Sequence, residues 1–264
     1  MCAGGSLSVI HETAIISSSA RLADDVEVGA YAVIEGDVEI GAGTTIRPHT
    51  VIKGETRIGR NNRIYQFASI GEDPQDKKYT GESTRLEIGD GNTIREFCTI
   101  NRGTAQDEGL TRIGNDNWLM SYVHIAHDCV IGDHTILANC TTLAGHVFVG
   151  DYAIFGGFSG VHQFCHIGAH SFMAMYSVVA RDIPAYIIVS GNPVQPRGIN
   201  KEGLKRRGFD RDQLRHLHEA YRLIYRDGLK IADAITELEQ RLEKQPVLLP
   251  LVESLKSSTR GITR

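Results

Sequence analysis

The chain has 264 residues, and its 28 lysines and arginines against 32 aspartates and glutamates give a formal net charge of −4. This balance gives no general reason to expect nucleic acid as a partner. The chain contains no apolar run of the roughly 20 residues that a membrane helix needs, and its start, "MCAGGSLSVIHE", lacks the pattern of a secretory signal. We therefore expect a cytoplasmic protein without a membrane span.

A six-residue period runs through most of the chain. An apolar residue, usually a branched aliphatic, recurs at every sixth position from Ile10 to Ile70, from Ile88 to Ile100 and, shifted by one residue, from Ile113 to Val179, giving 26 hexads. Neither a helix nor a half-buried strand has this spacing. A parallel β-helix does: each hexad forms a short strand and a corner, and three hexads close a coil that stacks at about 4.8 Å on the next.

Glycine often follows the aliphatic residue, as at Gly29, Gly41 and Gly59, and we expect it to turn the chain. The polar segments 71–85 and 101–110 break the period, so we expect them to leave the prism as loops, where sites are commonly built. The pattern ends after Pro184, and helical spacing follows from about Gly203. The prediction is a mainly β protein, with a β-helix over residues 1–190 and a small α-helical domain over 191–264.

Residues 18 apart occupy the same position on successive coils. The sequence "HIAHDC" begins one such face, and its outward positions form two adjoining columns: His127, Gly145 and Gln163 in one, and Asp128, His146 and Phe164 in the other. His124 and His162 lie nearby on the same face. This grouping fits a general base beside an acid, and it also fits a zinc site, which needs three converging protein ligands.

The five cysteines, Cys2, Cys98, Cys129, Cys140 and Cys165, show no paired metal spacing and are expected to be small buried hydrophobic residues. Cys129 and Cys165 share an inward column but lie two coils apart, which is too far for a disulfide.

Several longer motifs resemble a known family. The segments "IYQFASIGE", "QDKKYTGE", "HIAHDC", "LAGHV", "VHQFCHIGAHS", "GLKRRGF" and "STRGITR" are similar to those of the acyl-ACP–UDP-N-acetylglucosamine O-acyltransferases, which open lipid A synthesis. The resemblance runs from about Ile10 to the C-terminus. It implies a left-handed β-helix, a homotrimer with active sites between neighbouring prisms, and transfer of an (R)-3-hydroxyacyl chain from acyl carrier protein to the glucosamine 3-hydroxyl, with no cofactor and no metal.

The histidine column suits that reaction. A neutral imidazole at the position of His127 can take the proton of the attacking sugar hydroxyl. Asp128 would orient the ring and stabilise its charged form. The Gly145 N–H would face the developing oxyanion.

The resemblance also implies binding residues. Gln75, Asp76 and Lys78 in the first loop would contact the sugar and phosphates, beside His124, His146 and His162, while Gln163, Asn200, Glu202 and Arg206 would hold the UDP portion. The basic residues Lys205, Arg206, Arg207, Arg211 and Arg215 suit acidic acyl carrier protein. One position departs from the family pattern: Asn101, in "TINRGT", stands where the family usually has histidine, and asparagine cannot carry charge.

Met175 shares an outward column with Gly157 and Asn139 on a different face. In the family a small residue at the Met175 position leaves a groove open for a long acyl chain. One coil of about 4.8 Å spans roughly four carbons of an extended chain. We therefore predict that Met175 favours an acyl group of roughly ten carbons over one of roughly fourteen.

Three other functions compete with this prediction. The N-acyltransferase later in the same pathway carries an extra N-terminal domain, for which hexads starting at Ile10 leave no room. A γ-carbonic-anhydrase-like enzyme would bind zinc through histidines between subunits. A non-catalytic β-helix needs flat rows of one residue type, whereas this chain places His, Asp, Gly and Gln together.

Overall fold

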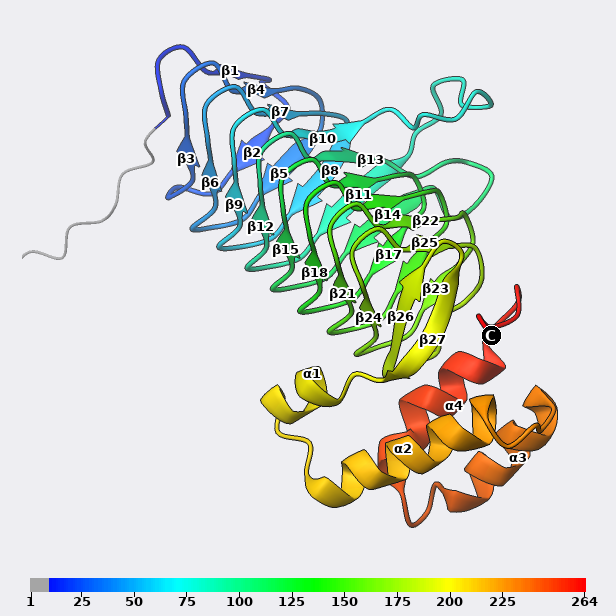
Figure 1. The fold of residues 1–264 in the computed structure, drawn as a ribbon. Coiled ribbons are helices and arrows are strands. Elements are labelled where there is room, and N and C mark those ends of the chain that lie inside the picture. The colour runs from blue at the N-terminus through cyan, green and yellow to red at the C-terminus, as the bar shows by residue number, and fades with distance from the viewer. Residues whose placement is uncertain (1–9) are drawn as a thin grey trace, which may run out of the picture.

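The protein is a left-handed parallel β-helix with helices at its C-terminal end, in a computed structural model that describes residues 10–264 (Figure 1). Three sheets form the sides of the prism, and their strands are parallel except for an antiparallel hairpin at the end of the third. The first contains β1 (Ile15–Ile16), β4 (Val33–Ile34), β7 (Val51–Ile52), β10 (Ser69–Glu72), β13 (Thr99–Asn101), β16 (His124–Ile125), β19 (Thr142–Leu143), β22 (Gly160–Val161) and β25 (Val178–Val179).

The second sheet contains β2 (Arg21–Leu22), β5 (Val38–Ile40), β8 (Glu55–Ile58), β11 (Arg85–Ile88), β14 (Leu110–Ile113), β17 (Val130–Ile131), β20 (Phe148–Val149) and β23 (His166–Ile167). The third contains β3 (Glu27–Val28), β6 (Thr45–Ile46), β9 (Arg63–Ile64), β12 (Thr93–Ile94), β15 (Trp118–Leu119), β18 (Ile136–Leu137), β21 (Ile154–Phe155), β24 (Phe172–Met173), β26 (Ile187–Gly191) and β27 (Val194–Ile199).

The hexad aliphatics point inward and form one continuous column. Ile34, Ile52, Ile70 and Ile100 are fully buried, and each pairs with the next in the first sheet. The spacing is 18 residues except across the two loops, where it becomes 30 from Ile70 to Ile100 and 25 from Ile100 to Ile125. The second interruption therefore adds seven residues, one more than a hexad, which explains the one-residue shift of the period.

Gly29, Gly41 and Gly59 do not turn the chain, which corrects the sequence prediction at these positions, whereas Gly71, after Ile70, does have a positive φ of 74°. Most corners are made by side-chain-bearing residues with positive φ, such as Asp128 at 59° and His146 at 61°, and Gly43 and Gly91 take this conformation at two others. Gly41 and Gly59 have no positive φ. A Cβ on Gly41 would lie 2.7 Å from backbone atoms of Gly59 on the next coil. Glycine is needed at these positions because successive coils pass too closely for a side chain.

The two loops leave the prism between β10 and β11 and between β13 and β14, within the segments 71–85 and 101–110, and project from the same side (Figure 1). Arg102 joins them. Its buried guanidinium donates to the Gly71 carbonyl and the Tyr79 hydroxyl and pairs with Asp73. The neighbouring Asn101, buried as well, donates to the Asp73 carbonyl over 2.9 Å. The base of the second loop therefore holds the first loop in place.

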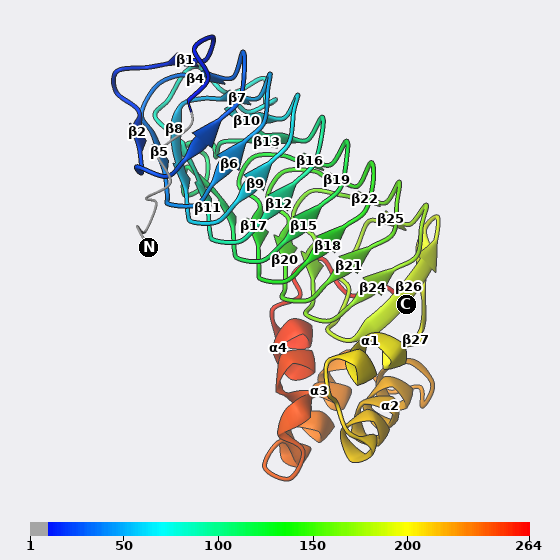
Figure 2. The same ribbon diagram turned by 90° about the vertical axis from the view of Figure 1, so that its left-hand side faces the viewer.

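The prism continues beyond residue 190, which is the domain boundary that the sequence predicts. The antiparallel hairpin of β26 and β27 extends the third sheet to Ile199, so that boundary falls inside a strand. Helices follow from Lys201: α1 (Lys201–Arg206), α2 (Arg211–Tyr225), α3 (Ile231–Arg241), the 3-10 turn η1 (Pro246–Leu248) and α4 (Leu249–Lys256). They lie beyond the last coils (Figure 2) and bury a second core around Leu217, Leu238 and Leu251.

Cys98, Cys129 and Cys165 are buried and Cys140 is half-buried, and all four are free thiols, whereas Cys2 lies outside the described residues. Within residues 10–264, no helix has the length and apolar character needed to cross a membrane.

Candidate active site

A groove of about 790 Å³ lies where both loops meet the histidine columns. It is lined by Gln75, Asp76, Lys77, Lys78, Gln106, Asp107, His127, His146, Gln163 and Phe164. The structure therefore brings together six of the predicted catalytic and binding residues: Gln75, Asp76, Lys78, His127, His146 and Gln163. On the prism face, the stacking of successive coils brings these residues together. The backbone N–H of His146 donates to the backbone carbonyl of His127, one coil away, over 3.0 Å.

His127 and Asp128 form a hydrogen-bonded pair. The Nδ1 of His127 lies 2.8 Å from Oδ2 of Asp128, and the two side chains are 14% and 2% exposed. Gly145 lies directly against the ring, since a Cβ there would stand 2.5 Å from Cε1 of His127. Among the described residues, no acceptor takes the Gly145 N–H. An imidazole, a carboxylate and a backbone N–H without an acceptor among the described residues thus lie side by side.

Thr104, in the second loop, fixes the carboxylate of Asp128. Its backbone N–H donates to Oδ1 over 2.9 Å and its hydroxyl donates to Oδ2 over 2.6 Å, and Thr104 is fully buried. Burial raises the pKa of the Asp128 carboxyl, but hydrogen bonds from His127 and Thr104 outweigh it and hold that pKa below its usual value. Asp128 is therefore charged at neutral pH and shares its Oδ2 with His127 and Thr104.

His146 is the third member of this cluster. Its Nδ1 lies 2.8 Å from Oδ2 of Asp107 in the second loop, and its Nε2 lies 3.8 Å from Oδ2 of Asp128. Its ring stands edge-on to that of His127, with centroids 5.0 Å apart, and stacks on Phe164. Sequence reasoning missed Thr104 and Asp107, because a loop outside the hexads has no register that relates its residues to the prism face.

Comparisons with family profiles, with curated proteins and with solved structures all find UDP-N-acetylglucosamine acyltransferases. The family profile described as "Udp N-acetylglucosamine O-acyltransferase; Domain 2" matches residues 182–263, and "Bacterial transferase hexapeptide (six repeats)" matches residues 19–54 and 110–145. The acyl-[acyl-carrier-protein]–UDP-N-acetylglucosamine O-acyltransferase of Thiobacillus denitrificans is 56% identical over 98% of this chain and 100% of its own length. That of Stutzerimonas stutzeri is 54% identical over the same shares.

Among solved structures, LpxA of Acinetobacter baumannii has a TM-score of 0.96 at 50% identity, covering 97% of this chain and 100% of its own. The Arabidopsis UDP-N-acetylglucosamine acyltransferase has a TM-score of 0.84 at 36% identity, with 97% and 100% covered. The chain belongs to the acyl-ACP–UDP-N-acetylglucosamine O-acyltransferase family. It is an O-acyltransferase, and the resemblance read from its motifs is confirmed.

Two further histidines predicted for the site lie beside the groove and are not among its lining residues. His124 is half-buried, with its Nδ1 2.7 Å from the Thr99 hydroxyl. Burial lowers its pKa, and the nearby His127 adds to that effect. His162 is exposed, with its Nδ1 3.2 Å from the Gln163 carbonyl.

Within a single chain of this acyltransferase, the structure does not bring Asn200, Glu202 and Arg206 to the groove. Asn200 is buried and caps α1, accepting from Gly203 and donating to the carbonyl of His170 at another corner of the prism. Glu202 is exposed and pairs with Lys205 over 3.0 Å. Arg206 is exposed in the last turn of the same helix.

The basic set of the C-terminal domain divides in two. Arg207 turns inward, where it contacts His170 over 3.2 Å and donates to the Tyr152 carbonyl, so it is not part of a basic surface. Lys205, Arg211 and Arg215 border a separate hollow of about 610 Å³. Its other lining residues are Ile199, Lys201, Phe209, Leu214 and His218.

Met175, at the turn between β24 and β25, is 58% exposed. Gly157 lies one coil away, and its Cα faces open space apart from the Asn139 carbonyl, 3.3 Å from a Cβ built there. The column expected from the sequence therefore exists, with a bulky side chain at one end and a bare backbone below it.

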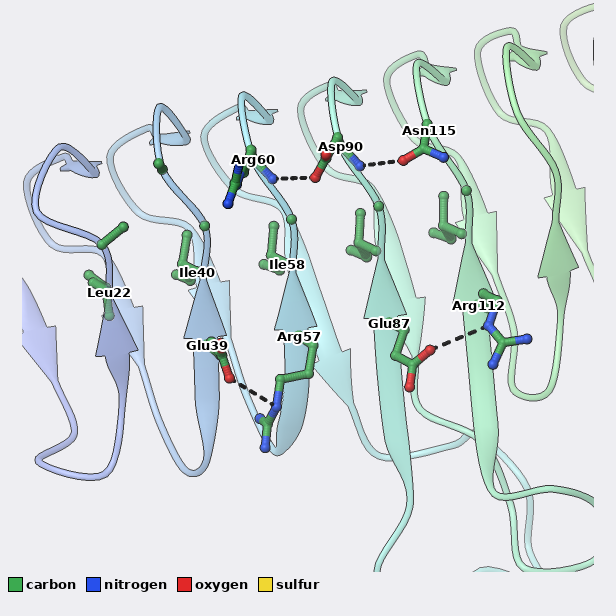
Figure 3. A pocket seen from close by; sticks show the side chains of 18 of the residues that line it. Leu22, Glu39, Ile40, Arg57, Ile58, Arg60, Glu87, Asp90, Arg112 and Asn115 are labelled. Carbon is green, nitrogen blue, oxygen red and sulfur yellow. Dashed lines mark hydrogen bonds and ion pairs between the residues drawn. The ribbon is translucent and has the colours of Figure 1, made fainter.

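A hollow of about 930 Å³ on the second sheet contains no candidate chemistry (Figure 3). Aliphatic side chains and glycine backbone form its floor, and the sign of the charge alternates from one strand to the next. Arg57 lies 3.5 Å from Glu39, and Arg112 lies 3.3 Å from Glu87. None of its lining residues is a histidine, cysteine, serine or threonine. This face is a ladder of ion pairs.

Proposed function

We propose that this chain transfers an (R)-3-hydroxyacyl group from acyl carrier protein to the 3-hydroxyl of UDP-N-acetylglucosamine, the first step of lipid A synthesis. The curated relatives named above carry this donor and acceptor in their names. The observation that carries the mechanism is the His127–Asp128 pair, hydrogen-bonded over 2.8 Å and lying against Gly145 in the groove.

In the proposed reaction, the Nδ1–H of His127 donates to the Asp128 carboxylate, which leaves the Nε2 lone pair free. Nε2 takes the proton of the sugar 3-hydroxyl as that oxygen attacks the thioester carbonyl. The Gly145 N–H donates to the oxyanion of the tetrahedral intermediate. The intermediate then expels the phosphopantetheine thiolate, which the imidazolium protonates, and Asp128 stabilises the imidazolium in between.

We propose direct transfer, with no acyl-enzyme, no cofactor and no metal step. Burial raises the pKa of the Cys129 thiol to about 12 and that of Cys165 to about 11. A thiol attacks as the thiolate, so neither side chain is suited to act as a nucleophile. Cys98 is buried, and burial raises its pKa to about 12 as well.

Substrate binding would use both loops. Lys77 and Lys78 place two positive charges at the groove, suited to a diphosphate, while Gln75, Asp76 and Gln163 offer groups that hydrogen-bond a sugar and nucleotide. Asn200, Glu202 and Arg206 lie outside the groove of their own chain. Their proposed contact with UDP therefore requires a neighbouring copy, which fits a homotrimer with sites between prisms.

Acyl carrier protein would dock at the hollow beside α1 and α2. Its apolar wall contains Phe209 and Leu214, and Lys201, Lys205 and Arg211 supply positive charge. Such a surface complements an acidic partner, mainly through a faster association rate.

Met175 would end the acyl groove one coil early, which favours a chain of roughly ten carbons. With donors of graded length, Met175→Gly should move the optimum toward longer chains by about four carbons. An unchanged optimum would show that Met175 only packs.

The deciding experiment is an acyl-transfer assay with UDP-N-acetylglucosamine and 3-hydroxyacyl carrier proteins, using wild type, His127→Ala and His134→Ala. His134 is a matched control, because its Nδ1 also lies near an aspartate, 3.9 Å from Asp116, but at a different corner of the prism. We expect transfer by wild type and by the control, and loss in His127→Ala. Transfer that survives His127→Ala would refute the base mechanism, and no transfer from any donor would refute the proposed function.

A further inference from the structure

The side chains of the proposed catalytic pair converge with His146 in a way that general-base catalysis does not require. One ligand atom from each of His127, Asp128 and His146 lies within 4.8 Å of the other two. Oδ2 of Asp128 is 2.8 Å from Nδ1 of His127 and 3.8 Å from Nε2 of His146. Ligands of a tetrahedral zinc ion stand roughly 3.4 Å apart, given metal–ligand bonds of about 2.0–2.2 Å. The two measured separations bracket that value.

The groups behind these ligands also match a metal site. A metal-binding histidine usually donates its other ring N–H to a carboxylate, which orients the ring and raises the basicity of the ligand nitrogen. Asp107 does this for His146, with its Oδ2 2.8 Å from Nδ1, so that Nε2 faces Asp128. Thr104 anchors the Asp128 carboxylate through two hydrogen bonds.

Burial and donor type narrow the class of ion. The side chains of His127 and His146 are 14% and 15% exposed, and that of Asp128 is 2% exposed. Two imidazoles and one carboxylate suit zinc, cobalt or a similar divalent transition ion, and they do not suit magnesium or calcium, which prefer oxygen ligands. The groove beside the cluster leaves a fourth position open to water or substrate.

From this convergence we propose that His127, Asp128 and His146 form a reversible site for a divalent transition-metal ion, and that the bound ion inhibits the acyltransferase. Unlike the zinc site considered from the sequence, it lies within one chain. Ion binding requires His146 to move closer to the other two ligands, from separations within 4.8 Å, and the His127–Asp128 pair to open from 2.8 Å.

The inhibition follows from the tautomer of His127, and this part rests on the proposed function. In the proposed mechanism Nδ1 keeps its proton for Asp128 and Nε2 accepts the proton of the sugar hydroxyl. An ion on Nδ1 moves the ring proton to Nε2, which then donates instead of accepting. The ion also occupies Oδ2 of Asp128. His127 therefore cannot act as a general base while the ion is bound, and the fold is unchanged.

Binding is tested without activity. Chelator-treated protein is titrated with Co²⁺, whose visible d–d absorption becomes intense in a four- or five-coordinate site. We expect saturable binding of one ion per chain, displaced by Zn²⁺. Asp107→Asn, on an exposed loop, should weaken binding about 10–100-fold, as expected when the partner of a ligand histidine is lost. His146→Ala should weaken it at least as much, and His134→Ala should not change it.

Inhibition is tested by the transfer assay. Zn²⁺ should slow wild-type transfer over the concentration range in which it displaces Co²⁺, and a chelator should restore the rate. Absence of saturable Co²⁺ absorption, or equal binding by His146→Ala, would overturn the site. Zn²⁺ binding without slower transfer would overturn the inhibition. If the chain transfers no acyl group at all, the proposed function fails, and the Co²⁺ titration still decides the site.

Discussion

Replacing Asp128 with asparagine tests the hydrogen-bond arrangement around the base. Asp128 Oδ1 accepts from the Thr104 N–H, and Oδ2 accepts from both the Thr104 hydroxyl and Nδ1 of His127. The NH₂ group of asparagine cannot face the Thr104 N–H, because two donors would meet. It must therefore take the position of Oδ2, where the Thr104 hydroxyl can turn to accept from it.

In that orientation the asparagine donates to Nδ1 of His127 and forces the proton onto Nε2, which is the wrong tautomer for a base. Restoring the active tautomer sets donor against donor, which costs about 1–3 kcal/mol. The transition state also loses a hydrogen bond to a charged group, about 1.5–3 kcal/mol. The sum of about 2.5–6 kcal/mol corresponds to a fall in kcat of about 10²–10⁴-fold.

The rate is measured by steady-state acyl transfer with saturating UDP-N-acetylglucosamine. The tautomer is measured by ¹⁵N NMR of the histidine ring nitrogens, which distinguishes Nδ1–H from Nε2–H without any substrate. We expect Nδ1–H in wild type and Nε2–H in Asp128→Asn, with the fold retained. A variant that keeps the Nδ1–H tautomer, or loses less than about tenfold in kcat, would show that the orientation argued from Thr104 is wrong.

Three further changes test other parts of the structure. Gly145→Ala places a methyl group 2.5 Å from Cε1 of His127, so the ring must move. We expect kcat to fall about 10²-fold, because a small misplacement of a catalytic group has an effect of this size. We expect little change in Tm. Arg102→Ala removes the buried link between the loops, and we expect KM for UDP-N-acetylglucosamine to rise and denaturant unfolding to show a loss of about 1–3 kcal/mol. His170 is held neutral, because burial and the adjacent Arg207 lower its pKa to about 4. Between pH ~4 and ~6.5 the unfolded chain, with a histidine pKa of about 6.5, binds more protons than the folded chain. The free energy of unfolding that His170 contributes above pH ~6.5 is therefore lost as the pH falls toward ~4. Allowing for partial solvent exposure, we expect this loss to be about 1–2 kcal/mol, and smaller in His170→Phe, which keeps the ring stacking.

The contradicting results differ for each change. Unaltered transfer in Gly145→Ala would mean that the His127 ring is not confined. An unchanged KM in Arg102→Ala would mean that the loops do not need their link to bind substrate. An identical loss of stability between pH 7 and pH 4 in His170→Phe and wild type would assign that loss to other groups.

Nearly all of the β-helix can be predicted from the sequence, because its strands pair at a fixed sequence separation. Each coil pairs with the coil 18 residues away, so a hexad such as that ending at Ile52 repeats the environment of Ile34 and Ile70. One period therefore determines strand, inward face and column together. The same register places His127 against Gly145, which is why this part of the site could be predicted from spacing alone.

Only the tertiary structure shows the conformation of the corners and the contacts of the two loops, because the six-residue period describes neither. Most corners with positive φ are occupied by residues such as His146, whereas glycines such as Gly41 are needed where successive coils approach closely, and only the coordinates separate the two roles. Thr104 and Asp107 reach Asp128 and His146 because a loop folds back over the prism, held at its base by Arg102. A loop has no repeat to relate its residues to distant ones, so its contacts depend on packing between segments that the sequence pattern leaves independent.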